Sequence, residues 1–177
     1  MDMGILWWIQ EHLRNGFTDW FFPAVTFLGD KGLIWILLGL ALLFFPKYRK
    51  WGIAMLCALL LTTLLGEGLL KHLIARPRPF MHYPDLALLI PPPSTYSFPS
   101  GHSAASFAAA VVLFRCRRSF GIPALILAAL IAFSRLFLFV HYPTDVLAGI
   151  LLGTAVGLLT CYLFRKFWQL RPVSSGQ

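Results

Sequence analysis

The sequence has 177 residues, the length of one ordinary domain. Hydrophobic residues make up 58% of it, charged residues make up only 12%, and the mean hydropathy is +0.74. Soluble domains carry about twice that share of charged residues, so this composition excludes a water-soluble protein and predicts a multi-pass membrane protein.

The formal net charge is +8, from 15 basic and 7 acidic side chains. We expect no nucleic-acid partner, because basic residues beside long apolar runs are better explained by membrane topology and by an anionic substrate. The three cysteines are far apart in apolar stretches, a pattern that argues against a disulfide framework and a zinc site. The first residues lack a small-residue cleavage site, so we expect no cleaved signal peptide.

The hydrophobic pattern predicts an all-α fold, a single domain over residues 1–177 with six transmembrane helices. Residues 4–13 add a short amphipathic helix that puts Ile5, Trp8 and Ile9 on one face, and we expect it to lie in the membrane interface. The predicted spans are 16–29, 33–46, 51–74, 101–116, 121–139 and 144–168.

Residues 75–100 interrupt this pattern. They contain seven prolines, too many for a continuous helix. Because long loops in compact domains are usually functional, we expect this loop to contribute to a site.

Basic residues are distributed unevenly over the predicted connectors. Ten lie on one side of the membrane, and five lie on the other: Lys31, Lys71, Arg76, Arg78 and Arg135. The positive-inside rule makes the side with ten basic residues cytoplasmic. Six spans then place both termini in the cytoplasm, and they bring the 75–100 loop and the 134–145 connector together at the extracytoplasmic face.

The first polar cluster of that face follows the third predicted span. Lys71 and Arg78 flank the end of the span, and taken by themselves they are ordinary helix-end cations that reach to the interface. Glu67 lies one turn before Lys71, so we expect a helical ion pair between the two. His72 and His82 have no evident partner and are left out of the site.

The second cluster, Pro99–His102, opens the fourth predicted span. Ser100 has two interpretations. It is an ordinary N-cap, or it forms an anion site together with the free N–H groups at the helix start, with His102 directed at the anion.

The third cluster combines Ser134 and Arg135 with a histidine and a carboxylate that are four residues apart, His141 and Asp145. Pro143 suits the first position of a helix, so Asp145 falls in the first turn, where the helix dipole favours a carboxylate. Asp145 can accept a hydrogen bond from one imidazole nitrogen and leave the other as a base or nucleophile. The alternative is a capping aspartate near an interfacial histidine.

Together, two histidines, one carboxylate, three cations and a helix start converge on one membrane face. Ionisable residues in membrane segments are usually functional. Three cations with backbone donors suit a phosphate that carries about two negative charges. Two histidines on separate elements suit displacement at phosphorus, one attacking and the other protonating the departing oxygen, although their spacing does not assign the two roles.

These residues resemble the signature of the type 2 phosphatidic acid phosphatase superfamily, a family of membrane lipid phosphatases. All three parts of the family's signature occur in order and with the family's internal spacings, between residues 71 and 145. The eleven specified positions are Lys71, Arg78, Pro79, Pro99, Ser100, Gly101, His102, Ser134, Arg135, His141 and Asp145.

The resemblance implies phosphoryl transfer without a metal or another cofactor. In that family's mechanism His141 would attack phosphorus and form a phosphohistidine, oriented by Asp145. His102 would protonate the leaving oxygen and then activate water. The implied phosphate-binding residues are Lys71, Arg78, Ser100, Gly101 and Arg135.

A site at the outer interface suits a phosphate on a lipid whose chain stays in the bilayer. The small size most resembles the bacterial undecaprenyl diphosphate phosphatases, so undecaprenyl diphosphate is the expected substrate, with phosphatidylglycerophosphate, phosphatidic acid and lipid A 1-phosphate as alternatives. A phosphotransferase that passes the phosphoryl group to an alcohol would use the same histidines. A non-enzymatic lipid transporter or scramblase would use the cations but has no use for the His141–Asp145 pair or for His102.

Overall fold

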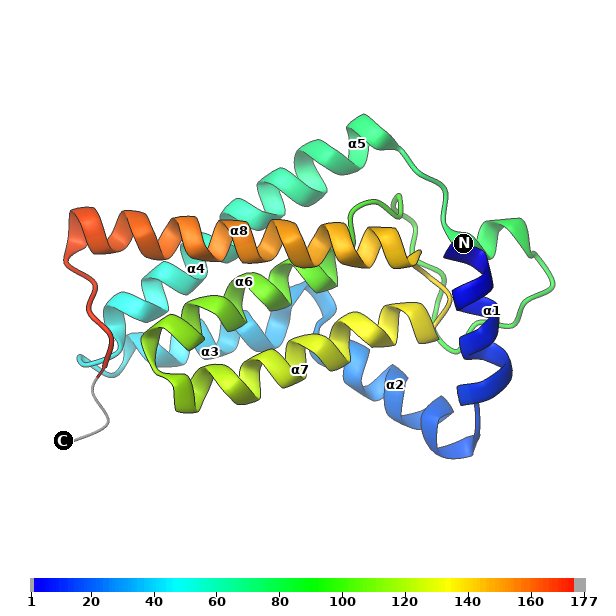
Figure 1. Cartoon of the computed structure of the whole chain (residues 1–177), viewed down its shortest axis with the longest axis horizontal. Helices are drawn as coiled ribbons and strands as arrows, with labels where there is room; N and C mark the ends of the chain where they lie inside the picture. The colour runs from blue at the N-terminus through cyan, green and yellow to red at the C-terminus, as the bar shows by residue number, and fades with distance from the viewer. Residues whose placement is uncertain (1, 174–177) are drawn as a thin grey trace.

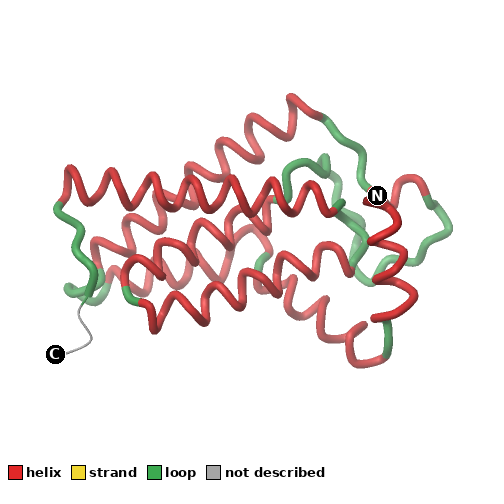
Figure 2. Tube along the Cα trace, in the orientation of Figure 1, coloured by secondary structure: helices red, strands yellow, loops and turns green. Residues whose placement is uncertain are grey.

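The computed structural model describes residues 2–173, and all regular elements in that range are helical, as predicted (Figure 2). The longer helices run side by side along the molecule, and α1 lies across one end of them (Figure 1). The elements are α1 (Asp2–Leu13), α2 (Gly16–Leu28), η1 (Asp30–Gly32), α3 (Leu33–Leu43), α4 (Arg49–Thr63), η2 (Leu64–Leu70), α5 (Lys71–Ile74), η3 (Pro79–His82), α6 (Gly101–Cys116), α7 (Arg118–Phe137) and α8 (Pro143–Trp168).

The third predicted span corresponds to one helical run from α4 through the π-helical turn η2 to α5. The run ends at Ala75, whose φ of 46° lies in the left-handed region. Pro77 and Pro79 follow, and a proline disfavours the helical conformation of the residue before it. The helix therefore stops one turn after Lys71 and leaves this lysine at the end of the bundle where the loop 75–100 begins.

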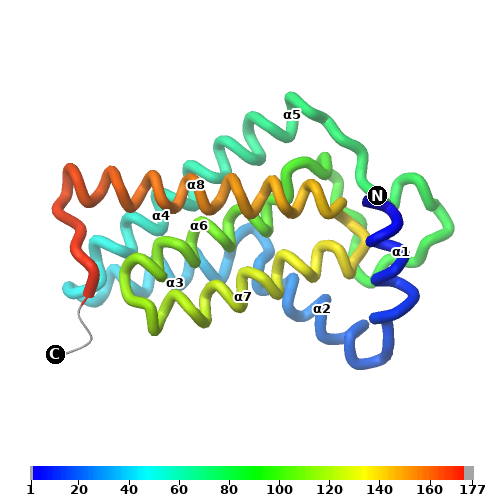
Figure 3. Tube along the Cα trace, viewed as in Figure 1, coloured from blue at the N-terminus to red at the C-terminus, as the bar shows by residue number. Residues whose placement is uncertain are grey.

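The first two predicted spans form one bent pair instead of two full crossings. The axes of α2 and α3 differ by 40° across the break at η1. With 13 and 11 residues, the two helices are about 20 Å and 17 Å long, each shorter than the ~30 Å hydrocarbon core of a bilayer. Figure 3 traces α2 from the end that holds α1 toward the middle of the bundle, and α3 from there to the opposite end.

The six-span count is not confirmed. Among the described residues, three helical runs are long and apolar enough to cross a membrane, and the bent α2–α3 pair is a fourth if it is counted as one span. These three runs are Arg49–His82, Arg118–Phe137 and Pro143–Trp168. The apolar helix α6 is shorter, with 16 residues.

The bent pair also bears on the prediction that both termini are cytoplasmic. Because α2 and α3 together traverse the bundle once, α1 lies at one end of the bundle and α8 finishes at the other (Figure 1). Arg14, one of the ten basic residues assigned to the cytoplasmic side, directly follows α1 and so lies at this end. The side of the membrane on which each terminus lies stays a prediction.

The N-terminal segment is helical, but its packing differs from the predicted face. α1 buries Leu6 and Ile9 against the bundle, whereas Ile5 and Trp8 are exposed. An exposed apolar pair of this kind suits the membrane interface, and the interfacial position of α1 stays a prediction.

A stripe of glycines on α8 sets the distance between the two helices that begin at the polar end of the bundle. A Cβ atom on Gly149 would lie 2.5 Å from the Ser100 carbonyl oxygen, and one on Gly153 would lie 2.1 Å from the Ala104 carbonyl oxygen. Small residues of this kind allow membrane helices to approach closely. As a result, the first turn of α6 lies directly against the first turn of α8.

Candidate active site

The eight site residues predicted from the sequence all lie at the end of the bundle that holds α1 and the loop 75–100. Lys71 begins α5, Arg78 lies in the loop, Arg135 is in the last turns of α7, and His141 lies between α7 and α8. Ser100, Gly101 and His102 open α6, and Asp145 is in the first turn of α8. The side chains of the three cations are buried, with 3–4% of each residue exposed.

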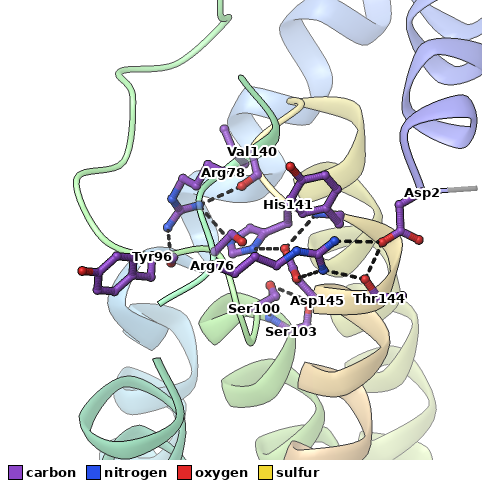
Figure 4. A network of polar contacts seen from close by, with 12 residues as sticks. Asp2, Arg76, Arg78, Tyr96, Ser100, Ser103, Val140, His141, Thr144 and Asp145 are labelled. Atoms are coloured by element: carbon purple, nitrogen blue, oxygen red, sulfur yellow. Dashed lines mark hydrogen bonds and ion pairs between the residues drawn. The ribbon is translucent and has the colours of Figure 1, made fainter. Parts of the chain in front are cut away.

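His141 is buried, and Figure 4 shows it between Arg78 and Asp145. Its Nε2 lies 3.1 Å from Nη1 of Arg78, and its Nδ1 lies 3.6 Å from Oδ2 of Asp145. The second distance falls within ion-pair range but is longer than a hydrogen bond. Burial lowers the pKa of His141 well below its usual value, and the positive charge of Arg78 lowers it further. The ring is therefore neutral near pH 7.

Asp145 is completely buried, and both of its carboxylate oxygens have partners. Oδ2 accepts a hydrogen bond from the backbone N–H of Tyr142 at 2.9 Å, so Asp145 also caps its own helix. Oδ1 accepts from Nη1 of Arg76 at 2.7 Å. Arg76 in turn contacts Asp2 of α1 and Thr144 (Figure 4). A buried carboxylate needs such pairing to stay charged.

The start of α6 has the N-cap that the sequence left as one of two alternatives, and its role as an anion site stays a prediction. The Ser100 hydroxyl accepts hydrogen bonds from the backbone N–H of Ser103 at 3.4 Å and from its hydroxyl at 2.9 Å, so Ser100 is an N-cap. The backbone N–H of Ser100 donates to the Asp145 carbonyl oxygen at 3.0 Å, which joins the second motif to the third. At Gly101 the helix start is occupied by a carboxylate, because an added Cβ would lie 2.2 Å from Oε1 of Glu67.

The ion pair expected between Glu67 and Lys71 is present. Nζ of Lys71 lies 2.6 Å from each carboxylate oxygen of Glu67. Since the same carboxylate lies over Gly101, it connects the lysine of the first motif to the helix start of the second. A carboxylate thus lies between a cation and the first residue of α6, an environment that also suits a phosphate oxygen.

The loop 75–100 holds Arg78 in place from several directions. Its Nε donates to the Thr95 carbonyl oxygen at 2.6 Å, and its Nη2 donates to the Tyr96 carbonyl oxygen at 3.2 Å. Its Nη1 donates to the Val140 carbonyl oxygen at 2.9 Å. The long loop therefore helps to fix the guanidinium group of Arg78 against His141.

The end of α2 and the start of η1 contact two further motif residues, Arg135 and His102. Nη1 of Arg135 donates a short hydrogen bond to the hydroxyl of Thr26, and Nε2 of His102 lies 2.8 Å from Oδ1 of Asp30. One turn of chain at the α2–α3 break thus touches the arginine of the third motif and the histidine of the second.

A cavity of about 660 Å³ opens beside Lys71 and Arg78, between the α4–α5 run and residues 92–96. Its lining also includes Glu67 and His72. It offers a route by which a headgroup can reach the buried cations. Among residues 2–173, no group of three or more His, Cys, Asp or Glu side chains is arranged to hold a metal ion.

Sequence reasoning missed two contacts of the site. In the sequence Arg76 counts only as one of the five basic residues on the extracytoplasmic side, and no pattern singles out Asp30. In both cases the partner is more than 60 residues away in the chain, so no local spacing could reveal the contact.

Several known proteins similar to this chain are phosphatases. The model of the PAP2 superfamily matches residues 51–169. Undecaprenyl-diphosphatase of Sulfolobus acidocaldarius is 37% identical over 139 residues, 77% of this chain and 67% of that protein. Decaprenylphosphoryl-5-phosphoribose phosphatase of Mycobacterium tuberculosis is 33% identical over 139 residues, 77% of this chain and 75% of that protein.

A solved structure extends the similarity to the whole fold. The crystal structure of a PAP2 type phosphatidylglycerolphosphate phosphatase from Bacillus subtilis matches with a TM-score of 0.79 and 29% identity, covering 96% of this chain and 87% of that one.

Proposed function

This chain belongs to the PAP2 superfamily and is a membrane lipid phosphatase; we propose that its substrate is undecaprenyl diphosphate, which it hydrolyses to undecaprenyl phosphate. The proposal of this lipid rests on the name of the Sulfolobus acidocaldarius relative and on the cationic site beside an open cavity. Phosphatidylglycerophosphate is the second candidate, because the Bacillus subtilis structure that resembles this fold is named for that substrate.

The observation that carries the mechanism is the contact between Arg78 and Nε2 of His141 at 3.1 Å. A guanidinium group only donates hydrogen bonds, so Nε2 must be the accepting nitrogen with a free lone pair, and Nδ1 holds the ring proton facing Asp145. The nucleophilic lone pair is therefore directed at the group that would bind a phosphate oxygen. Attack by Nε2 on the terminal phosphorus forms the N–P bond as the bond from that phosphorus to the bridging oxygen breaks, and undecaprenyl phosphate leaves.

The remaining residues then have distinct roles. Lys71, Arg78 and Arg135 neutralise the phosphate oxygens, and Ser100 with the Gly101 N–H binds them at the start of α6. Asp145 holds the Nδ1–H tautomer and stabilises the positive charge that the ring acquires. His102 gives its proton to the leaving oxygen, and it later takes a proton from the water that hydrolyses the phosphohistidine.

The sidedness of the site is also part of the proposal. The basic residues of the connectors 44–50 and 115–118 and of the end of α8 lie at the end of the bundle away from the site. The positive-inside rule makes that end cytoplasmic. The site and α1 would then face the extracytoplasmic side, where the headgroup of a lipid carrier exported across the membrane is presented.

The test is phosphate release by the purified full chain in lipid nanodiscs. The panel comprises undecaprenyl diphosphate, phosphatidylglycerophosphate, phosphatidic acid and lipid A 1-phosphate, each with EDTA present. We expect the highest kcat/KM for undecaprenyl diphosphate and no loss of activity in EDTA, because three buried cations supply the charge neutralisation. A higher kcat/KM for a glycerophospholipid would identify that lipid as the substrate in place of undecaprenyl diphosphate. Activity that requires added Mg²⁺ would contradict the metal-free mechanism. Phosphate found only on an added alcohol would identify a phosphotransferase.

A further inference from the structure

The break between α2 and α3 brings a carboxylate onto the second histidine of the site. Oδ1 of Asp30 lies 2.8 Å from Nε2 of His102, although the two residues are 72 positions apart in the chain. Asp30 is the first residue of η1, and its side chain is 54% exposed, whereas that of His102 is 19% exposed. The contact is therefore not an enforced pairing of two buried charges.

The backbone around Asp30 is shaped for this approach. Lys31 and Gly32 both have positive φ values, 51° and 69°. The lysine is the costly member of the pair, because the left-handed region is unfavourable for a residue that has a Cβ atom. A Cβ on Gly29 would lie 3.0 Å from Cδ2 of His102 and 2.8 Å from Cγ2 of Ile131, so only glycine allows the chain to pass this close to the imidazole ring.

A second contact anchors the same segment. Thr26, one turn before Asp30, accepts the hydrogen bond from Arg135 of α7. Through Thr26 and Asp30, the chain at the α2–η1 junction thus contacts two motif residues on two different helices, α7 and α6. An aspartate that merely terminated α2 or η1 would need neither contact.

We propose that Asp30 is the positioning residue for His102, an inference that rests on the proposed function. Its carboxylate accepts the Nε2–H hydrogen bond, which fixes the ring and stabilises the imidazolium form. Nδ1 is then the nitrogen that exchanges protons with the substrate. In the first step the bond from the terminal phosphorus to the bridging oxygen breaks, and the Nδ1 proton goes to that oxygen as the lipid phosphate leaves. In the second step Nδ1 takes a proton from the water that attacks phosphohistidine, the N–P bond breaks and phosphate is released.

In this account each histidine is held by its own carboxylate. Asp145 orients the nucleophile from the first turn of α8, and Asp30 orients the acid–base catalyst from the break between α2 and α3. The bent α2–α3 pair is then required for catalysis in addition to its structural role.

The experiment compares Asp30→Asn with wild type and with Asp19→Asn, an aspartate of α2 that pairs with Arg14. Each protein is mixed with ³²P-labelled substrate, quenched with alkali and assayed for labelled protein, alongside steady-state kinetics. For Asp30→Asn we expect kcat to fall about 10–100-fold with KM within about twofold of wild type, part of the ~10²–10⁴-fold that acid–base assistance supplies. The labelled phosphoenzyme should accumulate, because its hydrolysis needs His102. Asp19→Asn should behave as wild type, and Asp30→Glu should recover part of the lost kcat.

A double-variant comparison separates positioning from a structural role. Adding Asp30→Asn to His102→Ala should cost less than twofold, because a positioning residue has nothing left to position. Three outcomes would each overturn the inference. Asp30→Asn could lower kcat as strongly in the His102→Ala background as in wild type, or it could fail to fold by itself. It could also keep the wild-type kcat and accumulate no phosphoenzyme. A wild-type protein that releases phosphate from none of the lipids would instead refute the proposed function.

Discussion

Nη1 of Arg78 lies 3.1 Å from Nε2 of His141, and this contact determines which nitrogen of the ring carries a proton. Arginine has no acceptor, so Nε2 accepts and Nδ1 holds the proton on the side of Asp145. In the proposed mechanism Arg78 thus has two roles. It supplies a positive charge for the phosphate, and it sets the tautomer of the nucleophile His141. The 3.6 Å between Nδ1 and Asp145 leaves room for this pair to tighten as substrate binds, as catalytic hydrogen bonds often do.

Burial of His141 predicts a pH dependence of stability. Its pKa lies well below the usual value in the folded protein, whereas in the unfolded chain it is about 6.5. Below pH ~6.5 the unfolded chain therefore binds a proton that the folded protein does not, and stability falls by about 1.4 kcal/mol per pH unit until the folded pKa is reached. Above pH ~6.5 this residue contributes no slope.

Unfolding in detergent, followed from pH 8 to pH 5, measures this slope. The variant His141→Asn should show a shallower acid-side decline than wild type. A matched change at an exposed histidine of the loop, His82→Asn, should leave the decline as it is. Equal slopes in wild type and His141→Asn would show that the folded protein protonates His141 as readily as the unfolded chain does.

Loss of Arg76 should impair both stability and turnover. Arg76→Gln leaves Oδ1 of the fully buried Asp145 without its charged partner, which we expect to cost about 2 kcal/mol in unfolding free energy. A carboxylate that is no longer held also orients His141 less well, so kcat should fall about tenfold or more, equivalent to ~1.4 kcal/mol of transition-state stabilisation. KM should change little, because Arg76 does not line the cavity beside the cations.

The control for this prediction is Arg14→Gln, which breaks a more exposed arginine–aspartate pair at the same end of the molecule. Exposed pairs contribute about 0–1 kcal/mol, so its unfolding free energy and kcat should stay close to wild type. Equal effects of the two substitutions would mean that Arg76 has no special role at Asp145.

The Glu67 carboxylate pairs with Lys71, and in the proposed mechanism it should compete with the phosphate of the substrate for this lysine. In Glu67→Gln the neutral amide no longer neutralises the ammonium group that it contacts at 2.6 Å. We expect inorganic phosphate and vanadate to inhibit this variant about fivefold more tightly, a gain on the order of 1 kcal/mol. Inhibition constants from phosphate-release assays provide the measurement. Weaker inhibition would indicate that Glu67 instead holds Lys71 in its binding position.

Much of the fold follows from local spacing, and the differences follow from distant contacts. The prolines and the serine cap predicted where α6 begins, and Pro143 predicted the start of α8, because helix ends are encoded by adjacent residues. The apolar runs before and after Asp30 were each assigned as a span, although each is too short to cross a bilayer by itself. Their length was the available signal for a single broken span.

The candidate site shows the same difference between residues that local spacing predicts and contacts that depend on distant parts of the chain. Motif spacing identified His102, His141 and Asp145, since the family signature specifies their separations along the chain. It could not identify Arg76 as the partner of Asp145 or Asp30 as the partner of His102. Those contacts depend on how α1, η1 and α8 pack in three dimensions, and a single sequence carries no pattern that links them.

The central claim is that His141 is the phosphorylated residue, and the most direct measurement is covalent labelling of single variants. Wild type, His141→Ala and His102→Ala are each mixed with an activated ³²P-phosphate ester, quenched with alkali and assayed for acid-labile label on the protein. We expect label in wild type, none in His141→Ala, and persistent, slowly hydrolysed label in His102→Ala, because loss of the nucleophile closes the covalent route whereas loss of the acid–base group slows it. Label that persists in His141→Ala and disappears in His102→Ala would contradict the account and reverse the two roles.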